Sequence, residues 1–435
     1  MRIAIFGAGY VGLTSAACFA HIGHRVSLID ASVERMAALR RGETPIYEED
    51  LSDLLRSPNV SFARDAREAL READVALIAV GTPHDPESGA TDMRQVFAVA
   101  EEMAALLTHR VTVVTKSTVP VGTAKKLQAF FDGRRPDLRI DCASNPEFLR
   151  EGRAIKDFLE PDRIVVGAES PKAKEDCLNL YKPITDKGYP IYCYGAASAE
   201  AVKYASNGFL AIKIAYVNEI ADFCERTGAD VDEVAEGMGA DLRIGRQFLR
   251  PGPGYGGSCF PKDTRSLKAQ AQRAGAEARL IEAAISSNER RPAALLCRAK
   301  DKLAGGDWKG KRIGMLGAAF KGETDDVRES PALALARILC EEGAHVAIYD
   351  PQALKGAKNA LAGHASVVYA ADWQEAAKGA DIVVIATEWK EFSRINLKDL
   401  AALTQPDAAL FDARGMIDGE SAAKAGLRYV RVGKS

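Results

Sequence analysis

The sequence predicts an α/β protein with two doubly wound, Rossmann-like domains joined by a long central helix and a helical middle region. Two observations carry this prediction. Residues 311–350 repeat the strand, glycine-containing loop, helix and strand pattern of residues 3–30. Between these two ends, residues 198–226 form a helical stretch without proline. We therefore expect three domains, 1–196, 197–304 and 305–435.

Composition limits the kinds of partner. The chain has 435 residues, which is too long for one core, and a formal net charge of −2. That balance argues against nucleic acid or a membrane surface as the main partner. No run of about twenty apolar residues occurs, and a strand begins at residue 2, so we expect a cytoplasmic protein. The eight cysteines include no Cys-x-x-Cys pair, so we expect reduced thiols and no metal site.

The first strand, residues 3–6, runs directly into the loop GAGYVG at 7–12. A helix and a second strand ending in Asp30 follow, which is the full context of a dinucleotide-binding fingerprint. The glycines allow a tight turn and a close approach of pyrophosphate to the helix N-terminus. Asp30 would bind the ribose hydroxyls and favour NAD over NADP, while Arg35 lies near enough to soften that preference. A structural glycine turn is the alternative. The expected cofactor residues here are Gly7, Gly9, Tyr10, Val11, Gly12, Asp30 and Arg35.

Two further strands, residues 74–80 and 111–115, place Thr82 and Thr118 just beyond their carboxyl ends. Ligands of open α/β sheets bind at those ends, so we expect both threonines to touch the cofactor. Taken singly, each could equally be a turn-forming residue.

The stretch SNPEFLREG at 144–152 follows the next strand and predicts the start of a helix. On such a helix Glu147 and Glu151 would share one face, a turn apart. A capping role alone could explain Glu147. A position near a nicotinamide would explain Glu151.

The long helical stretch carries Lys203 and Asn207 four residues apart on a largely apolar rod. A buried lysine without a partner is costly, so this pair needs an explanation. The alternative is a lysine at the helix rim that reaches solvent.

The glycine- and proline-rich loop 250–258 leads to Cys259, and Lys262 and Asp263 follow where a helix over 263–275 is predicted. A thiol beside a cation and a helix N-terminus has the environment of a nucleophile. A buried thiol in a turn is the alternative. The next helical run is expected to break near Pro292.

The second α/β unit lacks the G-x-G-x-x-G pattern, so we expect no second dinucleotide there. Its loops carry Phe320, Lys321, Arg328 and Arg414. These side chains suit a phosphorylated ligand with an aromatic ring, such as a nucleotide, although ordinary surface charge would also explain each one.

Taken together, these motifs resemble the UDP-glucose/GDP-mannose dehydrogenase family of nucleotide-sugar 6-dehydrogenases. The resemblance spans the whole chain and rests on GAGYVG at 7–12, VGTP at 80–83, KSTVPVG at 116–122, SNPEFLREG at 144–152, KYASN at 203–207, GGSCFPKD at 256–263 and FKGETDDVRESP at 320–331. It implies an NAD domain, a dimer-forming middle and a nucleotide-sugar domain. It also implies that two NAD molecules in turn oxidise a sugar alcohol to an acid. UDP-glucose, giving UDP-glucuronate, is the expected substrate.

The resemblance also implies roles for particular residues. Cys259 would form a thiohemiacetal and then a thioester, while Lys203 and Asn207 stabilise the oxyanions. Asp263 would position water, and Glu147 with Thr118 would act through a water as general base. Glu151, Lys262 and Arg328 would lie near the cofactor. Arg243 would reach the neighbouring subunit's substrate. The expected substrate residues are Glu147, Phe148, Leu149, Glu151, Lys203, Asn207, Arg243, Phe248, Arg250, Gly252, Tyr255, Gly256, Phe320, Lys321 and Arg414.

Three alternatives stay open. GDP-mannose and UDP-N-acetylmannosamine 6-dehydrogenases share this architecture and the Cys-Lys-Asn-Asp set. A single-hydride hydroxyacid dehydrogenase shares the first domain and the long helix but has no use for Cys259. A non-catalytic NAD-binding regulator would not need the intact set of Cys259, Lys203, Asn207, Asp263 and Glu147.

Overall fold

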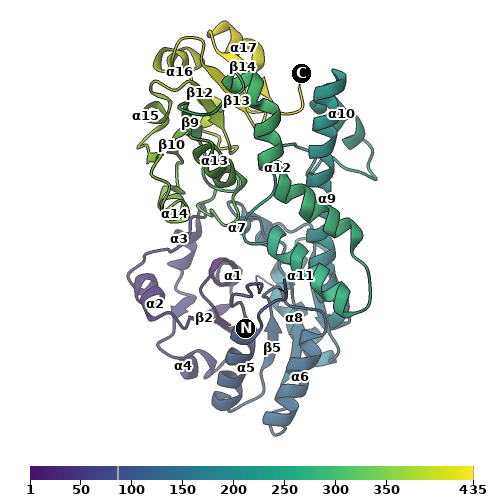
Figure 1. Ribbon diagram of the computed structural model, residues 1–435. Helices are drawn as coiled ribbons and strands as arrows, with labels where there is room; N and C mark the ends of the chain where they lie inside the picture. Colours follow the sequence, from purple (N-terminus) through teal and green to yellow (C-terminus); the bar gives the residue numbers. More distant parts are fainter. Residues whose placement is uncertain (86–87, 435) are drawn as a thin grey trace. The chain divides into compact units, whose positions relative to one another are not determined.

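The computed structural model describes residues 1–85 and 88–434, which divide into two compact units (Figure 1). The first unit comprises Met1–Ser206 and Arg265–Ala276, and the second comprises Asn207–Thr264 and Glu277–Ser435. Each unit contains one sheet. Two helices, α9 (Ala196–Thr227) and α11 (Phe260–Arg273), contribute residues to both units.

The first unit is built on an eight-stranded sheet of order β3-β2-β1-β4-β5-β6-β7-β8. Neighbouring strands are parallel except β6 and β7, and Ile3 of β1 pairs with Val26 of β2 and with Val75 of β4. The sequence did not predict β7 and β8. The strands are β1 (Arg2–Phe6), β2 (Arg25–Ile29), β3 (Val60–Phe62), β4 (Val75–Ile78), β5 (Thr112–Thr115), β6 (Asp141–Ser144), β7 (Ile164–Ala168) and β8 (Ile191–Tyr194).

Helices cover both faces of this sheet because successive strand residues point to opposite sides. Ile3 and Ile5 of β1 belong to a buried cluster with α1, α2, α3, α7 and α8, whereas Ala4 and Phe6 belong to one with α4, α5 and α6. These helices are α1 (Tyr10–His21), α2 (Val33–Arg40), α3 (Leu51–Leu55), α4 (Ala66–Leu70), α5 (Arg94–Leu106), α6 (Thr123–Arg134), α7 (Ala154–Leu159) and α8 (Pro171–Thr185).

The second unit contains a parallel sheet of order β11-β10-β9-β12-β13-β14, which repeats the order of the first six strands of the other sheet. Its strands are β9 (Arg312–Leu316), β10 (His345–Tyr349), β11 (Val367–Tyr369), β12 (Ile382–Ile385), β13 (Ala409–Asp412) and β14 (Arg428–Arg431). Its helices are α10 (Val231–Gly239), α12 (Arg279–Ala304), α13 (Pro331–Glu341), α14 (Leu354–Ala360), α15 (Trp373–Ala377), η1 (Phe392–Arg394), α16 (Leu397–Leu403) and α17 (Gly419–Lys424). The predicted class, two doubly wound α/β units with a long helix between them in the chain, is confirmed.

The prediction that the helical run breaks near Pro292 is wrong, because α12 continues through it. A proline inside a helix costs about 3 kcal/mol. Leu295 and Leu296 are fully buried on the next turn, and burying one such side chain contributes roughly 1.5–3 kcal/mol. Arg291 beside the proline also pairs with Asp222. Packing therefore outweighs the local penalty.

The prediction that a helix begins at 145–151 is also wrong, and Glu147 and Glu151 do not share a helical face. The segment has no regular structure, and α7 begins only at Ala154. Asn145 does not cap a helix here, because its Oδ1 accepts from the hydroxyl of Tyr181 at 2.5 Å and from Nζ of Lys116 at 3.1 Å, while its NH2 group donates to the carbonyl of Val165 at 2.8 Å. Its own N–H donates to the carbonyl of Thr115 at 2.9 Å, which extends the sheet pairing beyond β5.

The helix predicted from Asp263 begins three residues earlier, at Phe260. Pro261 fits in a first turn, where its missing N–H is not needed. The N–H of Asp263 donates to the carbonyl of Cys259 at 2.8 Å, so Cys259 stands directly before the helix.

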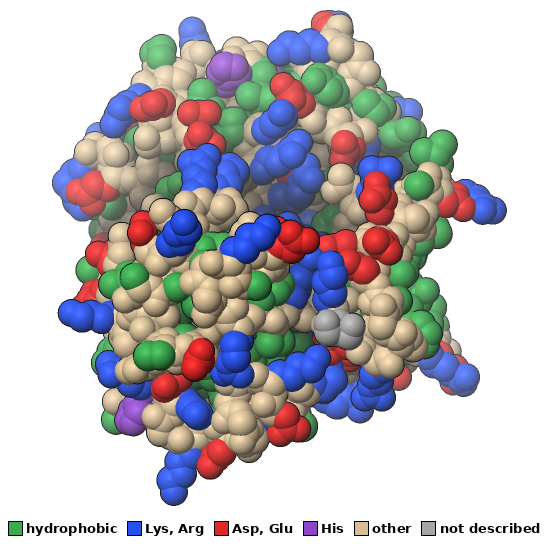
Figure 2. Space-filling model, turned by 90° about the horizontal axis from the view of Figure 1, so that it is seen from above, with side chains coloured by type: hydrophobic (Ala, Val, Ile, Leu, Met, Phe, Trp, Pro, Cys, Tyr) green, Lys and Arg blue, Asp and Glu red, His purple; other side chains and the backbone are tan. Residues whose placement is uncertain are grey.

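The face in Figure 2 carries charged side chains of both signs, with Lys and Arg gathered in the upper half of the view. Among the described residues, no helix is long and apolar enough to cross a lipid bilayer.

Candidate active site

The fingerprint loop leaves the start of α1 open. Gly7 has φ of +107°, and a Cβ there would lie 2.5 Å from the carbonyl oxygen of Ala79, so glycine is required. Gly9 precedes α1 without a side-chain cap, and a Cβ built on it would meet nothing within 4 Å. The first N–H groups of a 12-residue helix therefore face an open space, which suits a pyrophosphate.

Asp30 lies beyond the end of β2, next to this loop. Its Oδ2 accepts from the N–H of Ala8 at 2.7 Å, and its Oδ1 accepts from the N–H of Ser32 at 2.8 Å. Arg35 pairs with it at 3.2 Å, and the Asp30 side chain is 12% exposed. A carboxylate fixed in this way can accept hydrogen bonds from ribose hydroxyls. The loop and Asp30 together fit NAD.

Thr82 and Thr118 lie together beyond the carboxyl ends of β4 and β5. The hydroxyl of Thr82 donates to the carbonyl oxygen of Thr118 at 2.8 Å. Thr82 is buried and Thr118 is half-buried.

Glu147 and Lys203 form a buried ion pair. The Lys203 Nζ lies 2.7 Å from Oε1 of Glu147 and 2.7 Å from its carbonyl oxygen. The lysine side chain is only 4% exposed, which excludes a lysine that reaches solvent. Burial works to raise the pKa of Glu147, but the Lys203 charge and hydrogen bonds outweigh it and hold that pKa below its usual range. The acid is therefore ionised at neutral pH.

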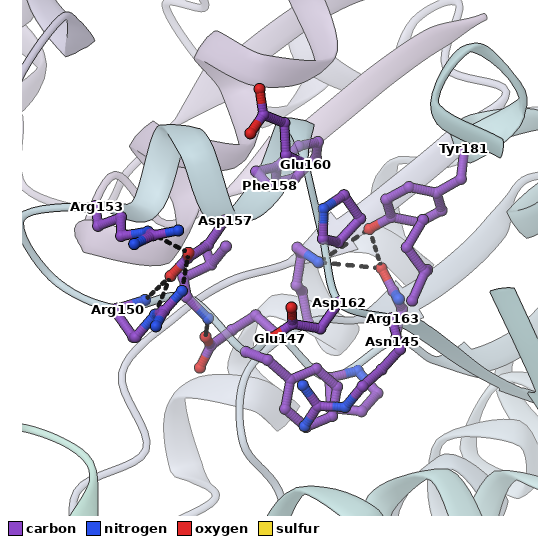
Figure 3. A pocket seen from close by; sticks show the side chains of 16 residues that line it. Asn145, Glu147, Arg150, Arg153, Asp157, Phe158, Glu160, Asp162, Arg163 and Tyr181 are labelled. Atoms are coloured by element: carbon purple, nitrogen blue, oxygen red, sulfur yellow. Dashed lines mark hydrogen bonds and ion pairs between the residues drawn. The ribbon is translucent and has the colours of Figure 1, made fainter. Parts of the chain in front are cut away.

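The residues after Glu147 line a neighbouring cavity of about 80 Å³, shown in Figure 3. The guanidinium of Arg163 lies 3.7 Å from the centre of the Phe148 ring. The N–H of Leu149 donates to Oε2 of Glu147 at 2.7 Å, and Glu151 is half-buried.

Sequence reasoning missed Lys116, which also lines this cavity. Its Nζ donates to the hydroxyl of Tyr181 at 3.0 Å and to Oδ1 of Asn145 at 3.1 Å. Burial lowers the pKa of Lys116 to about 8. The sequence did contain a signal for Lys116, because an ionisable residue stands there directly after a predicted buried apolar strand.

In the second unit, Asp263 accepts hydrogen bonds from two polar side chains at the start of α11. Its Oδ2 accepts from the amide of Asn207 at 2.6 Å, and its Oδ1 accepts from Nζ of Lys262 at 2.5 Å. Asp263 is buried, while the thiol of Cys259, one turn earlier on the same helix start, is partly buried. The hydroxyl of Ser258 lies 3.4 Å from its sulfur.

The glycine-rich loop packs against the loops of the second sheet. A Cβ at Gly257 would lie 2.7 Å from the ring of Phe320, so the backbone lies against that ring. Arg414 donates to the carbonyl of Phe320 at 3.1 Å, and Nζ of Lys321 lies 5.7 Å from the ring centre. A Cβ at Gly252 would meet Arg414 at 3.0 Å. The structure thus brings these predicted nucleotide residues together.

The other predicted residues of this unit are placed around that loop. The rings of Phe248 and Tyr255 each lie 6.0 Å from the ring of Phe260. A Cβ at Gly256 would lie 2.3 Å from the carbonyl oxygen of Glu329, and Arg250 donates to the carbonyl of Gly415 at 2.8 Å.

Two predicted arginines instead point to acids near them in the sequence. Arg243 pairs with Asp241 at 2.5 Å and is largely exposed, and Arg328 pairs with Asp326 at 2.7 Å. Within the described ranges, no group of three or more His, Cys, Asp or Glu could hold a metal ion.

Comparison with protein families gives three matches along the chain. They are the NAD binding domain of the UDP-glucose/GDP-mannose dehydrogenase family at residues 1–185, its central domain at 197–290 and its UDP binding domain at 314–419. With the fingerprint and Asp30, these matches make the chain an NAD-dependent dehydrogenase.

Individual relatives agree along the full length. A UDP-glucose 6-dehydrogenase of Rhizobium meliloti (strain 1021) is 42% identical over 440 residues, which cover 100% of both chains. A UDP-glucose dehydrogenase structure from the archaeon Pyrobaculum islandicum is 37% identical, with a TM-score of 0.90 and coverage of 100% and 98%. A UDP-D-ManNAc dehydrogenase structure from Pyrococcus horikoshii is 28% identical, with a TM-score of 0.85 and coverage of 100% and 99%. The chain belongs to the UDP-glucose/GDP-mannose dehydrogenase family.

Proposed function

We propose that this enzyme oxidises UDP-glucose to UDP-glucuronate, a four-electron reaction that yields two NADH per substrate. The observation that carries the proposal is the Asp263 carboxylate, held by Asn207 and Lys262 one turn after Cys259. A single-hydride dehydrogenase has no use for a thiol at that place. The curated relative that is 42% identical is itself a UDP-glucose 6-dehydrogenase, which supports this sugar nucleotide.

We assign one function to each of the three expected domains. Residues 1–196 would bind NAD, residues 197–304 would form the dimer and carry the cysteine loop, and residues 305–435 would bind the UDP part. The ranges matched by the three family domains support this assignment.

NAD supplies the hydride acceptor for both oxidations. The first oxidation removes a hydride from C6 and a proton from its oxygen, leaving an aldehyde. The sulfur of Cys259 then bonds to C6 while a proton goes to the carbonyl oxygen, giving a thiohemiacetal. Loss of a second hydride and of that proton leaves a thioester. Water adds to the thioester carbon, the carbon–sulfur bond breaks, and the acid and the thiolate are released.

The polar side chains would serve the charges that develop. Lys203 and Asn207 would stabilise the oxyanions, since an ammonium and an oriented amide are strong donors in a buried site. The hydrogen bond to Asp263 fixes which way the Asn207 amide faces. Glu147 is ionised and would accept a proton from the hydrolytic water, with Thr118 helping to place that water.

NADH counting on a substrate panel tests this function. We expect about two NADH per UDP-glucose consumed, with UDP-glucuronate as product. One NADH per substrate would contradict the two-step reaction. Strong activity with GDP-mannose alone, or with UDP-N-acetylmannosamine alone, would assign the enzyme to another branch of the family; the 28% identical UDP-D-ManNAc dehydrogenase structure keeps that second substrate in the panel.

A cysteine variant tests the covalent step. Cys259→Ser should keep NAD binding but lose acid formation, because an ester to serine is hydrolysed less easily than a thioester. Cys297→Ser, at an exposed thiol, is the matched control and should behave like the wild type. Undiminished turnover in Cys259→Ser would remove the covalent mechanism.

We also propose that the enzyme is a homodimer. Phe209, Tyr216 and Phe223 are exposed on α9 at intervals of seven residues, so they form one stripe along the helix. Exposed aromatic stripes of this kind mark interfaces. Analytical ultracentrifugation should give a dimer for the wild type and a monomer for Tyr216→Glu combined with Phe223→Glu. A monomeric wild type would contradict the proposal.

A further inference from the structure

Glu48 is a buried carboxylate in the segment that precedes α3, and the mechanism above does not use it. It accepts three hydrogen bonds from two other parts of the first unit. The hydroxyl of Tyr10 donates to its Oε2. The N–H of Gly152 donates to the same oxygen at 2.7 Å, and the N–H of Ala154 donates to Oε1 at 2.7 Å.

The first of these donors belongs to the dinucleotide loop. Tyr10 lies between Gly9 and Gly12 and is the first residue of α1, where NAD phosphates would lie. Burial, the Glu48 hydrogen bond and the nearby carboxylates raise the pKa of the Tyr10 hydroxyl above its usual range, so the phenol keeps its proton and donates. The same hydroxyl also lies 3.4 Å from the carbonyl oxygen of Arg150.

The other two donors belong to the segment that carries Glu147 and Glu151. That segment is fixed at its start by the Glu147–Lys203 pair and near its end by the Glu48 carboxylate. It has no helix or strand of its own before α7. Its conformation therefore depends on these side-chain bonds.

We propose that Glu48 is a positioning residue that holds the segment 147–152 in register with the dinucleotide loop and thereby couples NAD binding to the placement of Glu147. NAD that rests on the first turn of α1 fixes Tyr10, and Tyr10 acts on Gly152 and Ala154 through one shared carboxylate. Coupling through such a contiguous set of hydrogen bonds is typically 5- to 150-fold, or about 1–3 kcal/mol in general. The inference rests on the proposed function only for the role of Glu147.

The chemistry of the site requires a carboxylate. A glutamine presents one oxygen and one NH2 group, and the NH2 would face an N–H donor. At least one of the three donors would then lose its acceptor. Glu48→Gln is therefore the informative variant, and Glu49→Gln, at the exposed glutamate beside it, is the matched control.

Hydrogen exchange of the full-length protein tests the proposal without turnover. In Glu48→Gln we expect the amides of Gly152 and Ala154 to exchange about tenfold faster or more, with exchange in the second sheet unchanged. By calorimetry, the NAD dissociation constant should rise roughly 5- to 50-fold. In the wild type, NAD should slow exchange at these two amides, and in the variant it should not.

Tyr10→Phe tests the same link with only one hydroxyl removed, in case Glu48→Gln folds poorly. It should weaken the NAD-dependent protection of Gly152 and Ala154, and its effect should not add to that of Glu48→Gln. Exchange and NAD affinity equal to those of Glu49→Gln would overturn the proposal. So would faster exchange spread evenly over the chain, which would mean a purely structural role. Failure of the Cys259→Ser prediction would leave these results untouched.

Discussion

The two sheets share one strand order over six strands, yet the acids that follow β2 and β10, the second strand of each sheet along the chain, have different surroundings. Asp30, beside the fingerprint loop, is half-buried, whereas Asp350, at the matching place, is fully buried. Asp350 accepts hydrogen bonds from five donors, which are the N–H groups of Ala318, Ala319, Gln352 and Ala353 and the indole N–H of Trp389.

This difference shows that the repeated pattern is not enough to make a dinucleotide-binding site, even where a strand, a loop, a helix and a second strand ending in an acid are all present. In the second unit Trp389 takes the place beside the acid that a ribose could occupy. Ala319 also stands where the first unit has Gly9, so a methyl group lies where the other loop leaves backbone open. In the first unit the loop beside Asp30 is open for a ligand. In the second unit the corresponding acid, Asp350, instead binds the N–H groups of its own loop.

The largest effect should come from removing the buried acid. Asp350→Ala leaves four backbone N–H groups and an indole N–H without their acceptor, and we expect the free energy of unfolding to fall by roughly 3–5 kcal/mol. Asp30→Ala is the control and should cost about 1 kcal/mol, because water reaches that carboxylate. Urea unfolding of both variants checks this. Equal losses would erase the distinction between the two acids.

A buried cation extends the comparison. Lys116 follows β5, and the matching position after β13 is Ala413, which has no charge to bury. The folded pKa of Lys116 is about 8 against a usual value of 10.5, so the unfolded chain binds more protons between these two values. Stability should therefore rise with pH across that window. Below pH 8 the buried charge costs roughly 3 kcal/mol, from 1.36 kcal/mol per pKa unit.

Lys116→Met removes that charge but also loses two hydrogen bonds, to Asn145 and Tyr181. We expect a gain of roughly 1–2 kcal/mol at pH 7, and a flat response between pH 8 and 10.5. Unfolding measured at pH 7, 8, 9 and 10 checks both. Lys125→Met, at an exposed lysine of α6, should keep the wild-type pH dependence. A variant that is less stable at pH 7 would show that the hydrogen bonds outweigh the burial cost.

The residue that differs between the two loops, Gly9 in the first and Ala319 in the second, can be exchanged by substitution. Gly9→Ala should fold normally, since a Cβ there meets nothing within 4 Å. We expect the NAD dissociation constant to rise roughly 10- to 100-fold, or about 1.4–2.7 kcal/mol, because the methyl occupies the space left for pyrophosphate. Calorimetry with NAD measures it. Ala319→Gly is the control and should leave NAD binding as it is. Unchanged affinity in Gly9→Ala would place the cofactor elsewhere.

The smallest effect is expected at Arg35, which pairs with Asp30 through a side chain that is itself 42% exposed to solvent. Such a pair contributes at most about 1 kcal/mol, so Arg35→Ala should change the NAD dissociation constant by less than about fivefold. NADP should bind more weakly, because a cation near the 2′-phosphate is lost. Titration with both cofactors checks this. A large loss of NAD affinity alone would show that Arg35 binds the cofactor directly.

The sequence by itself determined the repeated strand pattern, the fingerprint with Asp30, and the spacing of Lys203 and Asn207 on one helix. These features are local, because strand and helix periodicity and glycine loops depend on residues close together in the chain.

Only the tertiary structure decided the rest. The segment after β6 is not a helix because its donors meet Glu48, 104 residues away, and Glu147 meets Lys203, 56 residues away. Pro292 remains helical because buried leucines beside it outweigh its local cost. Asp350 is closed to a ligand because the indole N–H of Trp389, 39 residues later in the chain, donates to its carboxylate. Partners so far apart in sequence leave no local pattern, and burial that overrides local propensity exists only once the chain has folded within each unit.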